Sequence, residues 1–163
     1  MKIFEFLQRR KVRKSFEPYL SPEVVRRLLN NPEHLLPKVK HFQFVVVLLD
    51  EANPQEISAL VGGVVRTLFE HQATVTTVSL SIVVGLMGVP FPGSDSPEVR
   101  RAVVEALLRE NGERIRIAHG ECDAAVGNFG GPMRFVYDAA IPGFLGILKN
   151  LLEAEPGSEV AVS

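Results

Sequence analysis

FVVVLLD, residues Phe44–Asp50, predicts a buried β-strand that ends on a carboxylate. An aspartate at the end of a buried strand is a natural ligand for a divalent cation. The next apolar stretch, His71–Phe91 (HQATVTTVSLSIVVGLMGVPF), would be expected to supply a second carboxylate, but it contains no Asp or Glu. Because magnesium takes several oxygen ligands and needs carboxylates to offset its charge, one aspartate makes a weak site. The two stretches together indicate a catalytic scaffold that lacks its catalytic groups.

Length and composition are those of one globular domain. The 163 residues are enough to bury a substantial core, and 46% of them are hydrophobic and 23% charged, as in ordinary soluble proteins. A formal net charge of −1 provides no overall attraction to nucleic acid or to anionic membranes. The single cysteine, Cys122, excludes an internal disulfide and is typical of a reducing compartment. We therefore expect a cytoplasmic protein in which this thiol is a small buried side chain.

Membrane association is not expected. Val75–Phe91 is at the short end of a membrane span, carries four hydroxyl side chains and ends in Gly88–Pro90, so we interpret it as two buried strands joined by a tight turn. Residues 1–20 form a basic N-terminal segment without the apolar core of a secretory signal. We expect a short amphipathic helix there that packs on its own domain or on a partner subunit, with a membrane-surface anchor as the alternative.

Three helix starts share one pattern, a capping side chain followed by proline. Ser21-Pro22, Asn53-Pro54 and Ser96-Pro97 each place a hydroxyl or amide at the N-cap and proline in the first turn. Apolar residues recur at helical spacing after each pair, and the first and third helices are expected to end at Asn30 and Asn111. A fourth apolar helix is predicted over residues 142–153.

Further strands are predicted in the second half of the chain. We expect strands over residues 114–117, 122–126 and 134–137, with a polar turn at His119–Glu121 and another at Gly127-Asn128. This order of elements is typical of an α+β or α/β sandwich with helices on one sheet. A single domain is expected over residues 21–154, followed by a flexible tail over 155–163.

Four segments, taken in order, resemble the class III adenylate/guanylate cyclase catalytic domain, over roughly residues 14–153. The likeness is to a degenerate bacterial member of that class. It implies a ferredoxin-like α+β sandwich with a mixed, mainly antiparallel sheet and helices packed on it. The segments are Phe16–Val25, similar to the helix that leads into many bacterial cyclase domains; Phe44–Asp50, similar to the first metal strand; His71–Phe91, similar to the central hairpin; and Val126–Gly130 with Arg134 and Tyr137-Asp138, similar to the loop and strand before the last helix.

The resemblance also implies a mechanism and an assembly. Such domains pair head to tail and bind ATP or GTP between two protomers. One protomer supplies two aspartates that hold two metal ions, which activate the ribose 3′-hydroxyl and neutralise the phosphates. The other supplies an asparagine for the ribose and an arginine for the transition state, while a lysine and an acid or threonine select the purine.

Most of these positions hold a different residue in this chain. Lysine keeps the charge of arginine but loses the planar fork that spans phosphate oxygens. The connection from Asp50 to His71 is also shorter than in active relatives and lacks the loop that would cradle the triphosphate. Position by position, the resemblance places the first metal aspartate on Asp50, the second on Ser81, the purine lysine on Thr77, the purine acid on Asp138, the ribose asparagine on Leu145 and the arginine on Lys149.

Several of these residues have a structural interpretation beside the functional one. Asp50 is either a remaining metal ligand or a carboxylate that caps the next turn. Asp138 is either a base-reading acid or a residue of a turn or strand edge. His119 and Glu121 are interpreted as a polar turn rather than an acid–base or metal pair. Val126–Gly131 is glycine-rich, but it lacks the strand–glycine–lysine–helix context of a phosphate loop, so a hairpin explains it better.

Two functions from different classes follow from the resemblance. The first is an interaction or regulatory module that forms a homodimer, or pairs with an intact cyclase or another signalling protein, without making product and without a cofactor. The second is a weak cyclase or a nucleotide sensor, in which Asp50 and Asp138 would still bind a nucleotide with one Mg²⁺ or Mn²⁺. Docking into a larger complex through residues 1–20 is a third possibility. Enzymatic activity is left open, with inactivity favoured.

Overall fold

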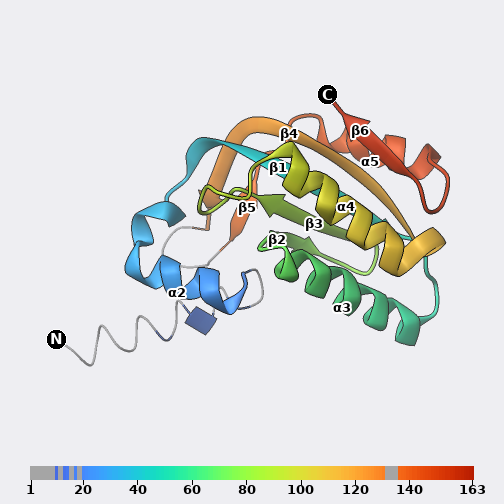
Figure 1. Cartoon of the computed structure of the whole chain (residues 1–163), viewed down its shortest axis with the longest axis horizontal. Coiled ribbons are helices and arrows are strands. Elements are labelled where there is room, and N and C mark those ends of the chain that lie inside the picture. Colours follow the sequence, from blue (N-terminus) through green and yellow to red (C-terminus); the bar gives the residue numbers. More distant parts are fainter. Residues whose placement is uncertain (1–9, 11–12, 15–16, 18–19, 131–135) are drawn as a thin grey trace.

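The computed structural model describes residues 10, 13–14, 17, 20–130 and 136–163, and a six-stranded sheet forms its centre (Figure 1). Four strands follow the order β2-β3-β1-β4, with every neighbouring pair antiparallel. One helix joins β1 to β2 and another joins β3 to β4, which is the β-α-β-β-α-β arrangement of ferredoxin-like folds. The α+β prediction is therefore confirmed. The elements are β1 (Lys38–Leu49), α3 (Pro54–Glu70), β2 (Thr74–Val78), β3 (Ile82–Met87), α4 (Pro97–Asn111) and β4 (Ile115–Asn128).

The C-terminal elements extend the sheet on the other side of β4. β5 (Tyr137–Ala139) pairs antiparallel with the end of β4, and β6 (Glu159–Val162) pairs parallel with its first half. α5 (Phe144–Glu153) connects these two short strands. The sheet is thus mixed and mainly antiparallel, as the resemblance implies.

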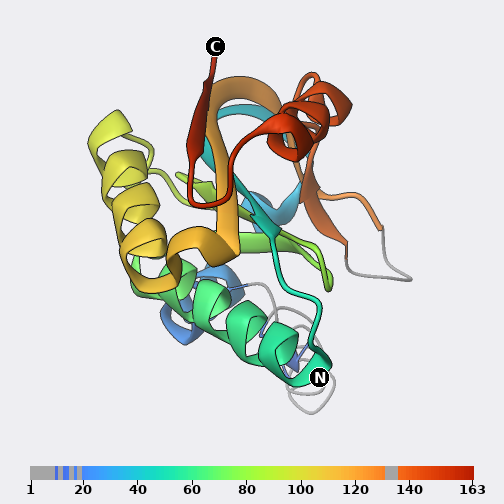
Figure 2. The same ribbon diagram turned by 90° about the vertical axis from the view of Figure 1, so that its right-hand side faces the viewer.

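Helices cover both faces of the sheet and give two hydrophobic cores. Alternate residues of β1 point to opposite faces, so Phe42, Phe44 and Val46 belong to one core and Val45, Val47 and Leu49 to the other. The first core packs against α2 (Pro22–Asn30) and α5, and the second against α3 and α4. Figure 2 shows α3 and α4 on one side of the sheet and α5 on the other. We call these two sides the α5 face and the α4 face.

The predicted helix caps are present. The Ser21 hydroxyl accepts a hydrogen bond from the Val24 N–H, and the Ser96 hydroxyl accepts one from the Val99 N–H. The Asn53 side chain accepts from two N–H groups of the first turn of α3. These bonds satisfy donors that a helix N-terminus otherwise leaves open. Two short 3₁₀ helices, Pro32–Leu35 and Gly112–Arg114, lie before β1 and β4.

The polar turn predicted at His119–Glu121 is wrong. Ile115–Asn128 is one continuous strand of 14 residues, because it pairs with the whole of β1, from Lys38↔Val126 to Leu49↔Ile115. Glycine is common in turns, but Gly120 lies within a strand, where β6 and the Phe44 ring pack closely against it. A Cβ there would lie 2.7 Å from the Val162 carbonyl oxygen and 2.9 Å from the Phe44 ring.

The C-terminal residues also differ from the prediction of a flexible tail. Glu159–Val162 forms β6, and its pairing with Ile117–Gly120 supplies the backbone hydrogen bonds that a free tail would lack. The pairing requires free backbone groups along β4, a strand that is distant from these residues in sequence.

Some predictions fall outside the described residues. The helix expected within residues 1–20 lies almost entirely there, as do Phe16, Tyr19, Arg134 and the start of the strand predicted at 134–137. Among the helices that the structure describes, none has the length and apolar character needed to cross a membrane.

Candidate functional site

Asp50, at the end of β1, is held by an arginine of the neighbouring strand. Arg116 Nε and Nη2 donate to the two Asp50 carboxylate oxygens at 2.7 and 2.8 Å. Both side chains are largely buried, at 25% exposure for Asp50 and 17% for Arg116. This is the bidentate arrangement in which guanidinium and carboxylate bind each other most strongly.

Arg116 also reaches the last helix. Its Nη1 donates to the carbonyl oxygens of Leu151 and Leu152, near the C-terminal end of α5, at 3.2 and 3.0 Å. Carbonyls in the last turn of a helix have no partner within the helix, and a cation there complements the helix dipole. One guanidinium therefore ties together β1, β4 and α5.

Ser81, which the resemblance assigns to the second metal position, lies in the turn between β2 and β3. Its carbonyl oxygen accepts a hydrogen bond at 2.8 Å from the N–H of Leu49, the last residue of β1. However, these residues do not fit a magnesium site. Ser81 is uncharged, the Asp50 carboxylate is engaged on both oxygens by Arg116, and no cluster of three or more His, Cys, Asp or Glu that could hold a metal occurs in the described part of the chain.

The connection after Asp50 is closed by local hydrogen bonds. Glu51 Oε1 accepts from the backbone N–H groups of Asn53 and Ala52, and these bonds, the first above all, lower the pKa of Glu51. α3 then begins at Pro54. Glu51, rather than Asp50, thus caps this turn, and only three residues separate Asp50 from the helix, so no loop is available to cradle phosphates.

Thr77 and Asp138, assigned to the purine-reading positions, line one cavity of about 190 Å³. The sheet curls so that β2 and β5, the two ends of its strand order, contact each other. The rest of the lining is apolar and includes Val84 and Phe144. Asp138 lies in an edge strand and accepts a hydrogen bond from the Ala139 N–H at 2.8 Å.

Leu145 and Lys149 lie one turn apart on the exposed side of α5. Leu145 is 82% exposed, and Leu152, two turns further along the same side, is 68% exposed. Where the resemblance expects polar catalytic groups, this helix presents an apolar stripe with one lysine.

Cys122 has no catalytic environment. Burial, and to a lesser extent the nearby Asp123 carboxylate, raises the pKa of this thiol to about 11. It therefore carries almost no thiolate near neutral pH and is inert, as expected.

Comparisons with known proteins were made by sequence and by structure. No family model and no curated protein matches the sequence. Solved structures do match. The guanylyl cyclase Cya2 superimposes with a TM-score of 0.61 over 76% of this chain and 75% of its own, at 18% identity. The fold is that of a nucleotide cyclase catalytic domain.

Two further cyclase structures agree with this assignment. The catalytic core of a rhodopsin-guanylyl cyclase, solved in complex with ATPαS, gives a TM-score of 0.62 over 77% of this chain and 79% of its own, at 10% identity. The adenylyl cyclase CyaB from P. aeruginosa gives 0.53 over 78% and 79%, at 14% identity. These identities are low enough that the likeness to the cyclase fold concerns architecture, while the site residues must be argued from their own contacts.

Sequence reasoning missed Arg116, which dominates the Asp50 environment. One signal was present: Arg114-Ile115-Arg116-Ile117 alternates as a half-buried strand, which predicts that both arginines lie on the face opposite to Ile115 and Ile117. Its partner depends on the β1–β4 register, in which Arg116 lies opposite Leu48, two residues from Asp50.

Proposed function

We propose that this chain is a catalytically inactive domain of the cyclase fold that acts as a dimerising regulatory module. Its partner is a second copy of the chain or an intact cyclase. The observation that carries the proposal is the bidentate pair between Arg116 and Asp50.

This pair competes directly with a metal ion for Asp50. A metal would have to displace two charge-assisted hydrogen bonds and move a guanidinium that also holds the end of α5. Ser81, which the resemblance assigns to the second metal position, is neutral and does not compensate for that loss. Breaking a largely buried ion pair costs about 3 kcal/mol or more, so binding of a metal at Asp50 alone is disfavoured.

The remaining positions support the same conclusion. Leu145 can neither donate nor accept a hydrogen bond to a ribose, and Lys149 lacks the planar fork of arginine. Removal of one electrostatic group from an active site typically costs about 3 to 4 kcal/mol of transition-state stabilisation. Several such losses together would reduce turnover to background.

The exposed side of α5 supports a dimerising role. Leu145 and Leu152 place apolar surface in solvent on the helix that, by resemblance, faces the second protomer. Apolar side chains at the centre of an interface contribute by desolvation. In a mixed dimer with an intact cyclase, one composite site would receive Ser81 and the other Leu145, so both would be silent and this chain would act as an inhibitor.

An activity and mixing assay tests the proposal. We expect no cyclic nucleotide from the purified chain with ATP or GTP and either Mg²⁺ or Mn²⁺. We also expect a concentration-dependent loss of activity when it is mixed with an intact cyclase of the same cell. Turnover by the chain alone would overturn the inactive assignment, and unchanged cyclase activity at a saturating ratio would overturn the inhibitory role.

The dimer surface can be tested separately by light scattering. The double variant Leu145→Glu/Leu152→Glu should convert a dimer into a monomer with unchanged helical content. Val39→Glu is the matched control, because Val39 is equally exposed (73%) but lies at the start of β1. If both variants leave the dimer intact, this side of α5 is not the interface.

A nucleotide sensor is the second candidate, favoured by the cavity that Thr77 and Asp138 share. A ligand that binds only the folded state raises the melting temperature by mass action. Titration with ATP and GTP, first with Mg²⁺ and then with Mn²⁺, should then raise the Tm, and Asp138→Asn and Asp50→Ala should reduce the shift. No shift at millimolar nucleotide would exclude this candidate.

A further inference from the structure

β6 is an edge strand that is paired on one side only, with β4. The Ile117 N–H donates at 3.0 Å to the carbonyl oxygen of Ser158, the residue before β6. Because the backbone groups of a strand point alternately to its two sides, every second residue from Ser158 onward faces β4. The N–H and C=O groups of Glu159 and Ala161 therefore point outward, and within the described residues no hydrogen-bond partner is found for them. In Figure 2, β6 lies between α4 (yellow) and α5 (orange-red).

The two faces of this edge differ in chemical character. Glu159 extends over the α4 face, where its two carboxylate oxygens accept hydrogen bonds from Arg101 at 2.7 and 2.6 Å. Val162 lies on the other face and packs against the α5-face core. Because side chains alternate along a strand, a strand added to this edge would place every second side chain on the polar α4 face and the others beside the valines of β6. A segment that fits must therefore alternate polar and apolar side chains.

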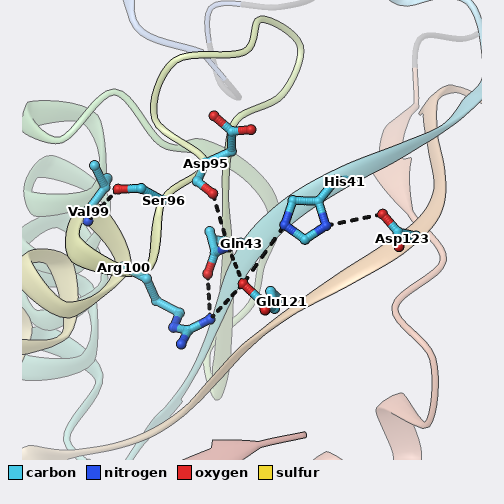
Figure 3. A network of polar contacts seen from close by, with 8 residues as sticks. All are labelled: His41, Gln43, Asp95, Ser96, Val99, Arg100, Glu121 and Asp123. Carbon is cyan, nitrogen blue, oxygen red and sulfur yellow. Dashed lines mark hydrogen bonds and ion pairs between the residues drawn. The ribbon is translucent and has the colours of Figure 1, made fainter.

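The first two arginines of α4 are already paired. Arg100 Nη1 donates to the side-chain oxygen of Gln43, a fully buried residue of β1, and lies 3.8 Å from Glu121 (Figure 3). The amide nitrogen of Gln43 in turn donates to Glu121 at 2.7 Å. Arg101, besides its two bonds to β6, has its Nε 3.1 Å from Glu105. Neither guanidinium thus provides a free positive charge beside the edge.

Acidic side chains predominate around the edge. Glu98 lines a groove of about 520 Å³ along the first three turns of α4, and the wall of this groove includes His119, which lies opposite Ala161 in the strand register. Of the arginines of α4 and β4, only Arg109 lacks an acidic partner in the described part of the chain, so the edge attracts cations. Four exposed glutamates have no cationic partner within the same residues: Glu98 in α4, Glu113 in the 3₁₀ helix before β4, and Glu153 and Glu155 shortly before β6.

Charge also argues against a second copy of the chain as the occupant. Two β6 strands can pair antiparallel about a two-fold axis, but this pairing brings two sets of the same glutamates together. Like charges that face each other across an interface are unfavourable, whereas a basic segment is complementary to the same surface.

We propose that the open edge of β6 binds an extended segment of a partner protein by strand addition, and that this segment alternates basic and apolar side chains. The outward groups of Glu159 and Ala161 bond its backbone, and its basic side chains lie beside the glutamates of the α4 face. Its apolar side chains pack beside Val160 and Val162. In strand addition, main-chain hydrogen bonds supply affinity and the alternate side chains supply specificity. This edge is distinct from the exposed side of α5, so binding here does not require the proposed dimer.

Residue-resolved amide exchange of the whole chain tests the edge directly. The probe is the acetylated and amidated hexapeptide Lys-Val-Lys-Val-Lys-Val. In the free chain the amides of Glu159 and Ala161 should exchange fast and those of Val160 and Val162 slowly. Saturation with the probe should slow the two outward amides about tenfold or more. Unchanged exchange of these amides overturns the proposal, and protection that rises with protein concentration in the absence of probe overturns it in favour of a second copy.

Fluorescence anisotropy with a labelled probe tests the role of charge. We expect a Kd in the micromolar to millimolar range, and about tenfold weaker binding of the hexapeptide Glu-Val-Glu-Val-Glu-Val. Glu98→Gln/Glu105→Gln should also weaken binding of the basic probe. Glu56→Gln/Glu70→Gln is the matched control, because it removes two exposed charges from α3 and should leave binding unchanged. Equal binding of the basic and acidic peptides overturns the assignment of a basic partner.

A proline at the edge tests the backbone contact. Ala161→Pro removes an outward N–H and leaves the bonds between β6 and β4 in place, so it should weaken binding about tenfold or more. Ala161→Val keeps the N–H and is the matched control. Slow exchange of Val160 and Val162 in the proline variant shows that β6 is still paired, and full binding by that variant then overturns the proposal. If β6 detaches in the variant, the exchange experiment on the wild type decides alone.

Discussion

The two faces of the sheet each hold an arginine, a carboxylate and a second polar group, but they differ in how completely these groups are paired. On the α5 face, Arg116 uses its guanidinium nitrogens on Asp50 and on two helix carbonyls. On the α4 face, Arg101 and Glu159 pair with each other, and His119 is left without a partner. A completed set of contacts stabilises the fold, whereas buried ring nitrogens without partners cost stability.

Loss of the Arg116 guanidinium should have the largest effect. Arg116→Leu leaves the Asp50 carboxylate largely buried without its partner and the end of α5 without a cation, so we expect a loss of about 3 kcal/mol in the free energy of unfolding. Urea denaturation measures this loss. Asp50→Leu/Arg116→Leu should be clearly less destabilised than the sum of the single variants. Additive effects would mean that the pair is not the source of the stability.

A side chain at Gly120 should weaken the attachment of β6. In Gly120→Ala the new methyl group would meet the Val162 carbonyl oxygen and the Phe44 ring at 2.7 and 2.9 Å. We expect a destabilisation of about 2 kcal/mol, together with faster amide hydrogen exchange in Glu159–Val162. Gly146→Ala in α5, where a Cβ meets no atom within 4 Å, is the control and should not destabilise the protein. Unchanged exchange in β6 would contradict the packing explanation.

Replacement of His119 should have the opposite sign from replacement of Arg116. His119→Phe removes a buried group that lacks partners, so the free energy of unfolding should be unchanged or rise by about 1 kcal/mol at neutral pH. The folded-state pKa of His119 lies below its ordinary value of 6.5, so wild-type stability is fully present above that pH and falls as pH decreases toward the folded pKa. The variant should lack this part of the decline. A large destabilisation by His119→Phe would make the histidine structural.

The smallest effect is expected at Glu159. Its ion pair with Arg101 is partly exposed, so Glu159→Gln should cost less than about 1 kcal/mol. The hydrogen bond from Arg101 lowers the pKa of Glu159 below 4.5, so its contribution is present above that pH and is lost as pH falls through the folded pKa. Denaturation of wild type and variant across this acidic range checks the difference, which should disappear at the lowest pH.

The sequence was informative where structure is set locally and less so where it is set by pairing. Ser21, Asn53 and Ser96 mark helix starts because a cap depends only on the next few residues. Of the positions that the resemblance assigns, Thr77 and Asp138 line one cavity, and Ser81 bonds through its backbone to Leu49, the residue before Asp50.

The errors share a physical origin. The segment around Gly120 has the composition of a turn, but pairing with the twelve residues of β1 keeps it extended. Likewise, the last residues form β6 by pairing with the open edge of β4, which is distant in sequence. The partner of Arg116 and the isolation of His119 depend on the same register, so neither could be read from neighbouring residues.

The contact between Arg116 and Asp50 also determines how the end of β1 depends on solution conditions. A dissociable ion fills its site in proportion to its free concentration, and a chelator removes it. Arg116 is covalently part of the chain, and its charge persists at every physiological pH. The Asp50 carboxylate therefore has a permanent cationic partner in the folded chain. The position of α5 should be insensitive to changes in the free concentration of magnesium or manganese.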